Sequence, residues 1–386
     1  MGAQFLQQLF GRRSLSQTVL VRFFRKPGLL VLPVLWCLPV QLMAAPYVVY
    51  DPRAAAMGGA TVALSGRYAV VQNMALAGRA QEFVDWNLAL PAIGWETTDA
   101  SGFVPALTSY QLNPNQNDLQ DMAGYTRSHH EYAAVVATVP SDIFAGGLFL
   151  LQDEYRGQRV VMDTSDSARV LSNSYVEKRA LQFTQHGVGI ARYHESVLGV
   201  LRNVTVGYVP KLILARSTLY RESVDIADTA IIYPSADTQH HSAFNLDLSI
   251  LKEVSRFSSL AVSLQNVLPM SFRYSSVYAG RALVNPQARL GFAYERRDRT
   301  FAVDVDLTSN PDIAFTSRSR IIAGGGEYAF GEYFRLRGGL KFNLLGEQEM
   351  LLTGGAGIEV KGHRIDLAIQ DGPGVSGASA HLNIQF

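Results

Sequence analysis

Downstream of Met43 the sequence alternates apolar and polar side chains over segments of roughly ten residues, and no run of about 18 apolar residues interrupts the pattern. Successive side chains of a pleated strand point to opposite faces, so this alternation predicts strands with one apolar face and one polar face. A helical membrane protein is thereby excluded. The alternation is clearest at 84–90, 244–250, 260–265, 301–307, 334–342, 365–370 and 377–386.

The apolar face of these segments consists of Leu, Ile, Val and Phe for roughly ten residues, which is the length of a tilted transmembrane strand. Strands survive in a bilayer only as a closed cylinder, because every backbone donor and acceptor must be paired within the protein. Counting alternating segments from Phe83 onward predicts an all-β fold, a transmembrane antiparallel β-barrel of about 14 strands. A soluble β-sandwich, whose strands also alternate, is the alternative.

The N-terminus has the order of a secretory signal. Cationic residues precede an apolar run at 28–43, two alanines follow it, and no acidic residue appears before Asp51. The sequence therefore predicts a cleaved signal peptide at 1–45 and export to the bacterial outer membrane. A membrane anchor is the alternative, but the run is shorter than the roughly 20 residues needed and contains two prolines.

Thiol chemistry is absent from the predicted mature chain. Cys37 is the only cysteine of the sequence, and it lies inside the segment expected to be removed. Disulfides, thiolate nucleophiles and thiolate metal sites are therefore excluded. The formal net charge of +1 gives no polyelectrolyte signal, so nucleic acid is not expected as a partner.

The last ten residues, GASAHLNIQF, read as the final strand of the barrel. Even-numbered residues from Ala380 to Phe386 would face the lipid of the outer membrane, and odd-numbered residues from Ser379 to Gln385 would face the interior. A terminal aromatic such as Phe386 resembles the insertion signal that the barrel-assembly machinery reads. An ordinary edge strand ending on phenylalanine is the alternative.

Two stretches rich in small residues follow the predicted signal: YDPRAAAMGGATVAL at 50–64 and AVVQNMALAG at 69–78. They resemble the start of the fatty-acid-transporter (FadL-type) superfamily of outer-membrane barrels, where an R-x-x-G-M-G-G-A segment and an N-P-A motif belong to a plug. The matching residues are Arg53, Met57, Gly58, Gly59 and Asn73, although methionine replaces the proline of the second motif. The resemblance implies a small N-terminal plug at 46–80 inside a barrel at 81–386. Glycines there allow either a hinge or close packing against the wall, and packing is favoured.

Over its predicted mature length the chain is also similar to the plasmid conjugative-transfer TraF-like barrels. The similarity rests on the order of short stretches: LPAIGWETTD (90–99), GYVPKLIL (207–214), FNLDLSIL (244–251), SLQNVLPMSF (263–272), NPQARLGFAY (285–294), VDVDL (303–307) and LRGGLKF (336–342). The family label denotes a genetic context, so the resemblance supports the barrel more than any activity.

No motif carries an obvious chemistry. The sequence lacks G-x-S-x-G, H-E-x-x-H and the phosphate-binding G-x-x-x-x-G-K, so neither an enzyme nor a cofactor is expected. The glycine-rich GGGEYAFG at 324–331 reads as a strand that allows close packing. Two groups of histidines could be interpreted as metal ligands: His129-His130-Glu131 and His240-His241. They fall in two long connections expected at 97–132 and 217–241, and we interpret them as solvated loop residues.

Charges of both signs alternate with the apolar faces and are expected in the lumen. The tentative lumen-lining residues are Asp247, Asp304, Asp306, Arg289, Arg335, Arg337 and Lys341. They could line a polar pathway, but their balance favours a ladder of cross-strand ion pairs that fills the lumen.

Three functions remain open from the sequence. The preferred one is a non-enzymatic outer-membrane barrel, plugged at its N-terminus, that admits or holds a small hydrophobic molecule. The alternative is a structural or interaction component of a conjugation or secretion apparatus, whose long connections would contact partner proteins. An enzyme at the rim of the barrel is the third, and it lacks a nucleophile signature.

Overall fold

The computed structural model describes residues 47–78, 87–139, 145–166, 168–197, 199–229, 237–310, 313–316, 318–345 and 350–385. It divides into two units: the first comprises Met1–Val40 and Ser196–Arg202, and the second comprises Gln41–Glu195 and Asn203–Phe386. In the first unit, the described residues form the end of the strand at 175–197 and the start of the strand at 201–223. The barrel and the sites below belong to the second unit. No helix in the described ranges is long and apolar enough to cross a membrane.

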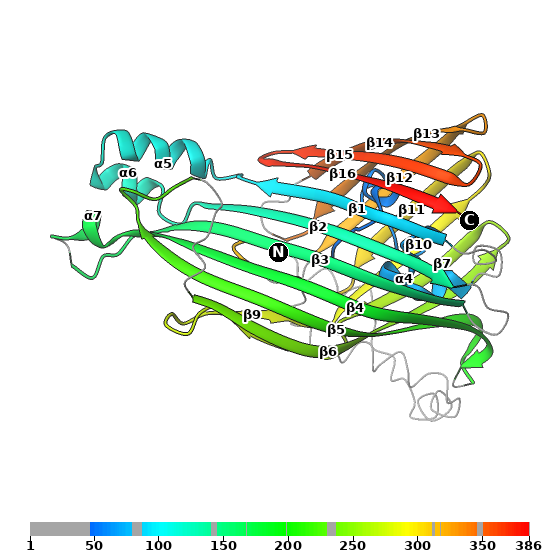
Figure 1. Ribbon diagram of the computed structural model, residues 1–386. Coiled ribbons are helices and arrows are strands. Elements are labelled where there is room, and N and C mark those ends of the chain that lie inside the picture. The colour runs from blue at the N-terminus through cyan, green and yellow to red at the C-terminus, as the bar shows by residue number, and fades with distance from the viewer. Residues whose placement is uncertain are drawn as a thin grey trace, which may run out of the picture. The chain divides into compact units, whose positions relative to one another are not determined.

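Sixteen strands occur in the described residues. Fourteen of them are β1 (Asn87–Thr98), β2 (Thr126–Val139), β3 (Ala145–Val161), β4 (Tyr175–Val197), β5 (Leu201–Ser223), β6 (Thr238–Ser255), β7 (Ser258–Gln265), β10 (Gln287–Glu295), β11 (Arg299–Asp306), β12 (Ile321–Phe330), β13 (Phe334–Asn343), β14 (Met350–Val360), β15 (His363–Gly372) and β16 (Val375–Gln385). They close into one barrel in which β1 pairs with both β2 and β16 (Figure 1). The predicted fold class is confirmed.

The two faces of the barrel wall differ as the alternation predicts. Along β11 and β15 the odd-numbered apolar residues point outward, and Phe301 and Ile369 are 55% and 67% exposed. The even-numbered partners Asp304 and Asp366 are buried inside. In β16, Leu382 points outward whereas the neighbouring polar side chains are buried. An apolar exterior around a paired backbone is what a bilayer-spanning cylinder requires.

Strands β3 to β6 are longer than predicted, with 17, 23, 23 and 18 residues. The predicted bounds of the two long connections, 97–132 and 217–241, are therefore wrong. The segments that lie between these strands are 99–125 and 224–237. His129 and His130 belong to β2, and His240 and His241 belong to β6, so their assignment to loops is wrong, although His240 is exposed to solvent as predicted. The many polar residues at these strand ends, such as Glu177, Lys178 and Arg179 of β4, hid the period of two.

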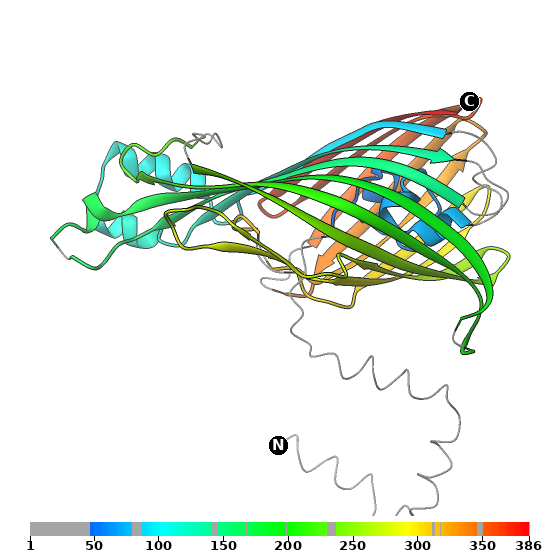
Figure 2. The ribbon, with the colours of Figure 1, turned by 60° about the horizontal axis from the view of Figure 1, so that its bottom comes forward.

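Residues 47–78, here called the N-terminal segment, lie inside the barrel, where the blue helices of Figure 2 sit behind the strands. The segment contains the helices α3 (Pro52–Ala55) and α4 (Ala69–Gln72) and the 3-10 helix η1 (Met74–Gly78). Asp51 caps α3 by accepting from the Arg53 N–H at 2.9 Å, and Pro52 supplies the fixed φ of a first helical turn. Gly58 and Gly59, at φ +76° and +87°, end it, because only glycine takes this conformation cheaply.

Helices α5 (Phe103–Leu112), α6 (Gln116–Asp121) and α7 (Val170–Asn173) lie at the ends of the long strands (Figure 1). Together with the adjoining parts of β3 to β6 they form a unit that we call the extension. Its core joins Phe103, Leu107 and Tyr110 of α5 to Val160 and Val176 of the strands. The separate hairpin of β8 (Met270–Arg273) and β9 (Arg281–Val284) packs its apolar face against the inner side of β4 and β5.

Strand β1 is irregular at Leu90 and Pro91. Its pairings with β16 and β2 both shift register just after Ala89. Proline has no N–H to donate to a neighbouring strand, which accounts for the break. The Leu90 carbonyl accepts instead from the hydroxyl of Tyr68 at 3.0 Å, so the N-terminal segment is attached to the wall at this point.

Candidate functional site

The predicted glycine motif packs against strands that are themselves glycine-rich. A Cβ on Gly58 would lie 2.7 Å from the Gly324 carbonyl oxygen of β12 and closer still to that of Leu340 in β13. A Cβ on Gly325 would lie 2.6 Å from the Cα of Met57. The Gly58 N–H donates to the Thr353 hydroxyl at 2.9 Å. The glycines therefore serve close contact between backbones, as the packing interpretation proposed.

Arg53 joins the N-terminal segment to the wall through charge. Its guanidinium contacts both carboxylate oxygens of Glu327 in β12, at 2.8 and 3.1 Å, and also donates to the Ser65 carbonyl at 2.7 Å. Arg53 and Glu327 are both buried. Two parallel hydrogen bonds between a guanidinium and a carboxylate fix orientation as well as charge.

Glu327 is shared by several arginines of the wall. Arg337 of β13 contacts it at 2.6 Å, and Arg364 of β15 contacts it at 3.4 Å. Arg337 also pairs with Asp366 at 2.6 Å, and Arg335 pairs with Glu359 at 3.1 Å. This group of charges, the Glu327 cluster, links β12, β13 and β15 to the N-terminal segment.

A second set of charges holds the segment from β10 and β11. Asp304 accepts from the N–H groups of Thr61 and Val62 at 2.6 and 2.9 Å. Arg289 pairs with Asp306 at 2.6 Å and donates to the Gly59 carbonyl at 3.3 Å. Two predicted lumen residues, Asp304 and Arg289, thus contact the segment itself.

The remaining predicted residues lie in separate places. Asn73 is buried within the segment, where its amide donates to the Val62 carbonyl and its oxygen accepts from the Ala75 N–H. Asp247 pairs with Lys211 at 2.8 Å on the neighbouring strand. Phe386, the predicted insertion signal, lies outside the described residues.

Tyr50 connects the segment to β2 and β3. Its hydroxyl donates to Asp153 at 2.6 Å, and the other Asp153 oxygen lies 3.4 Å from the His130 ring nitrogen. Burial first, and then the neighbouring Asp153 charge, raise the pKa of Tyr50 well above its usual value, so the phenol keeps its proton and donates. His130 stacks on Tyr155 with ring centroids 4.3 Å apart.

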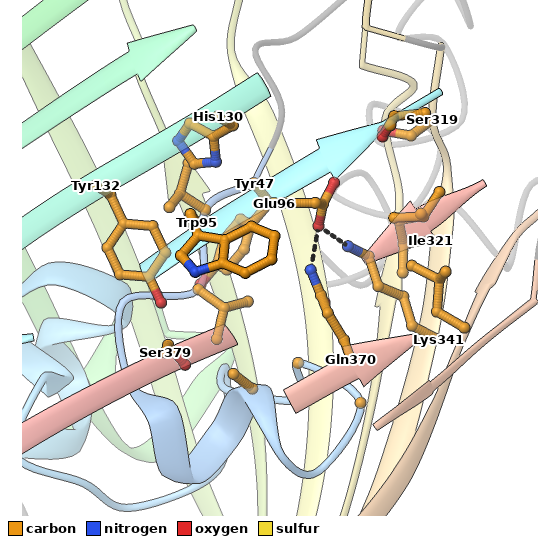
Figure 3. A pocket seen from close by; sticks show the side chains of 18 of the residues that line it. Tyr47, Trp95, Glu96, His130, Tyr132, Ser319, Ile321, Lys341, Gln370 and Ser379 are labelled. Atoms are coloured by element: carbon orange, nitrogen blue, oxygen red, sulfur yellow. Dashed lines mark hydrogen bonds and ion pairs between the residues drawn. The ribbon is translucent and has the colours of Figure 1, made fainter. Parts of the chain in front are cut away.

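A cavity of about 180 Å³, the luminal cavity, lies between this aromatic group and the opposite wall (Figure 3). One side carries the rings of Tyr47, His130, Tyr132 and Tyr155. Tyr132 meets Tyr50 edge-on at 5.4 Å, which fixes its ring in place. The floor is the N-terminal segment, which contributes Val48, Val49, Ala55, Gly58 and Gly59.

The other side of the luminal cavity is polar. Glu96 of β1 accepts from the Gln370 amide at 2.6 Å and lies 3.5 Å from the Lys341 ammonium, as the dashed lines of Figure 3 show. The three side chains come from β1, β13 and β15. Of the predicted lumen-lining residues, Lys341 and Arg289 reach this cavity.

The barrel wall is thin beside the cavity. Gly94, Ser379 and Ala368 are aligned across β1, β16 and β15 on the inner face, and their side chains are small or absent. On the outer face, Ala378 and Ala380 lie in a groove of about 580 Å³ that we call the outer groove. Cavity and groove share lining residues, among them Trp95 and Ala368.

Sequence reasoning missed Glu327 and Glu96. Glu327 is the single acid in GGGEYAFG, and its place on the inward face of a glycine strand was the available signal. His130 belongs to the stretch interpreted as a connection, and Glu96 directly precedes that stretch. The period of two from His130 to Val136, with Tyr132 and Ala134 between them, continues into that stretch and could have revealed the strand.

Solved structures share this fold. A FadL homologue of Pseudomonas aeruginosa aligns with a TM-score of 0.54 at 12% identity, covering 89% of this chain and 98% of that one. The toluene transporter TodX of Pseudomonas putida gives 0.52 at 11% identity, with the same coverage. The CymD monoaromatic hydrocarbon channel also gives 0.52 at 11% identity, again with 89% and 98% covered. At such identities the likeness concerns the fold.

The described residues form a closed 14-stranded barrel with a glycine-packed segment in its lumen, and this defines the class by its fold, which is that of the FadL homologue. Within that class the sequence itself is informative, because the model of the family described as F plasmid transfer operon, TraF, protein matches residues 70–306. The chain belongs to this family. The comparison with curated protein sequences found no match.

Proposed function

We propose that this protein is a non-enzymatic barrel of the bacterial outer membrane that binds a small hydrophobic molecule in its lumen and admits it across the wall. The luminal cavity carries the proposal: aromatic rings line one of its sides, the N-terminal segment forms its floor, and a barrel with an apolar exterior surrounds it. Signal cleavage, insertion by the assembly machinery and contact with outer-membrane lipid belong to the same proposal.

The size of the cavity supports a ligand of one ring. Its volume of about 180 Å³ is close to the roughly 150 Å³ of an apolar protein cavity that binds benzene. TodX is described as a toluene transporter and CymD as a monoaromatic hydrocarbon channel, which agrees with this size. Aromatic walls favour a planar ligand, because offset and edge-on ring contacts add to the burial of apolar area.

The thin wall gives a route between lumen and lipid. The luminal cavity and the outer groove share lining residues of β1, β15 and β16, among them Ala368, Ala378 and Ser379, and the ring of Tyr132 lies against Gly94 at the same place. The register break after Ala89 lies on the same strand as Gly94 and Trp95. We infer that a ligand passes here rather than through the N-terminal segment, which is fixed by charge and backbone contacts.

Filling the cavity tests the proposal. Ala368 lines both cavity and groove, and Ala368→Phe should reduce uptake of a fluorinated benzene into proteoliposomes by about tenfold, the loss for a contact worth 1.4 kcal/mol. The matched control is Val303→Phe, which adds a ring on the exposed outer face of β11. Uptake that remains unchanged in Ala368→Phe, with normal folding of both variants, would remove the proposed route.

A second candidate function is an interaction component of a conjugation or secretion apparatus. The family description and the folded core of the extension favour it. Replacing 103–121 by a short glycine-serine linker should then abolish capture of partner proteins and leave ligand uptake intact. Retention of the partners in that variant would count against this function.

A further inference from the structure

The luminal cavity has two chemically different sides. Aromatic rings of Tyr47, Tyr132 and Tyr155 form the first side, and the guanidinium of Arg289 covers one face of the Tyr47 ring at 3.9 Å. The second side is the group Glu96, Gln370 and Lys341, seen together in Figure 3. A purely apolar ligand would contact the first side and make no hydrogen bond to the second.

The polar side is loosely paired. Gln370 binds Glu96 at the short distance of 2.6 Å, whereas the ammonium of Lys341 lies 3.5 Å from the same carboxylate oxygen. Charge-assisted N–H···O bonds are usually about 2.7–2.9 Å long. The side chains of Lys341 and Glu96 are 29% and 33% exposed, so both remain accessible to a ligand. An oxygen atom placed beside both could accept from the ammonium and donate to the carboxylate.

We propose that the luminal cavity selects a neutral, planar aromatic molecule that bears one hydroxyl group. The ring lies against Tyr132 and Tyr155, and the hydroxyl bridges Lys341 and Glu96. This inference rests on the proposed function and specifies the class of ligand.

Both kinds of ion fit less well. An aromatic carboxylate would pair with Lys341 but would be repelled by Glu96, and an organic cation would meet the opposite conflict. A hydroxyl is both a donor and an acceptor, so it satisfies the two charged groups together. A hydrocarbon of the same size would remove water from Lys341 and Glu96 and offer them no hydrogen bond, and sites built to bind a hydroxyl discriminate strongly against such analogues.

Three fluorinated probes of similar size separate these possibilities. 4-Fluorophenol is a neutral hydroxyl compound at pH 7, since phenols ionise near pH 10. Fluorobenzene lacks the hydroxyl, and 4-fluorobenzoate is an anion. Binding to the full mature barrel in detergent is followed by 19F NMR, and the signal in detergent micelles without protein measures partition into micelles. We expect 4-fluorophenol to bind at least about tenfold more tightly than either other probe. The ratio is modest because Lys341 and Glu96 are partly exposed.

Lys341→Met should remove that preference by weakening the binding of 4-fluorophenol, and fluorobenzene should bind at least as tightly as to the wild type, because methionine replaces a polar group that a hydrocarbon cannot bind. Glu96→Gln should also reduce the preference for 4-fluorophenol. Lys252→Met, on the exposed outer face of β6, should leave this preference unchanged. Equal binding of fluorobenzene and 4-fluorophenol, or tighter binding of 4-fluorobenzoate, would overturn the inference and leave the proposed function standing. If no probe binds the wild-type barrel, the proposed function itself fails.

Discussion

Glu327→Gln is expected to lower the free energy of unfolding by about 3–5 kcal/mol, the usual cost of removing one partner from a buried ion pair. Glu327 is 4% exposed and neutralises Arg53 and Arg337 at 2.8 and 2.6 Å. With glutamine in its place, these guanidinium groups stay buried and lose their shared counter-charge. Urea unfolding in phospholipid bilayers, followed by tryptophan fluorescence, measures the change.

The same substitution on the surface is the control. Glu332 lies 3.6 Å from Arg297, and these side chains are 72% and 93% exposed. Glu332→Gln should change stability by less than about 1 kcal/mol, because water already solvates both charges. Arg53→Met should cost less than Glu327→Gln, since Glu327 keeps its wall arginines. Equal effects of Glu327→Gln and Glu332→Gln would show that the Glu327 cluster does not stabilise the barrel.

Gly58→Ala is expected to release the N-terminal segment from β12 and β13. The added methyl group would overlap two backbone carbonyl oxygens that cannot move aside. Overpacking of this kind costs about 1–3 kcal/mol, and each 1.4 kcal/mol raises the population of the released segment about tenfold. Tryptic cleavage after Arg53, which is buried in the intact protein, should accelerate in proportion.

Gly331→Ala is a closely matched control. Gly331 also has a positive φ, +67° against +76° for Gly58, but no atom would lie within 4 Å of its new Cβ. Both substitutions introduce the same backbone strain, and only Gly58→Ala adds an overlap of the new methyl group with backbone carbonyl oxygens. Faster permeation of a small polar dye should accompany faster cleavage in Gly58→Ala alone. If the two variants behave alike, close packing at Gly58 does not hold the segment.

The regular part of the barrel could be predicted because the alternation that marks its strands is visible within each short segment of sequence. From β10 to β16 the strands have 8 to 11 residues, and each alternates apolar and polar side chains, so the period of two is visible without knowledge of neighbours. Glycines 324 to 326 were likewise interpretable as a strand, since their neighbours Tyr328 and Ile322 keep the alternation.

The site could be predicted less well because it depends on distant partners. Arg53 and Glu327 are 274 residues apart in the sequence, and nothing local marks them as a pair. Glu96 belongs to β1, whose end is rich in polar residues, and its partners come from β13 and β15. Which charges meet in a lumen follows from strand register, and register is fixed by the closed sheet as a whole.

The pairing of β1 with β16 also constrains biogenesis. The first and last strands of the sheet must meet before a cylinder exists, so the wall stays open until the C-terminal strand has been made. The N-terminal segment is attached directly ahead of β1 and is held by β11, β12 and β14 as well. The sheet therefore wraps around a part of its own chain, which must lie within the curve of the sheet when the first and last strands pair.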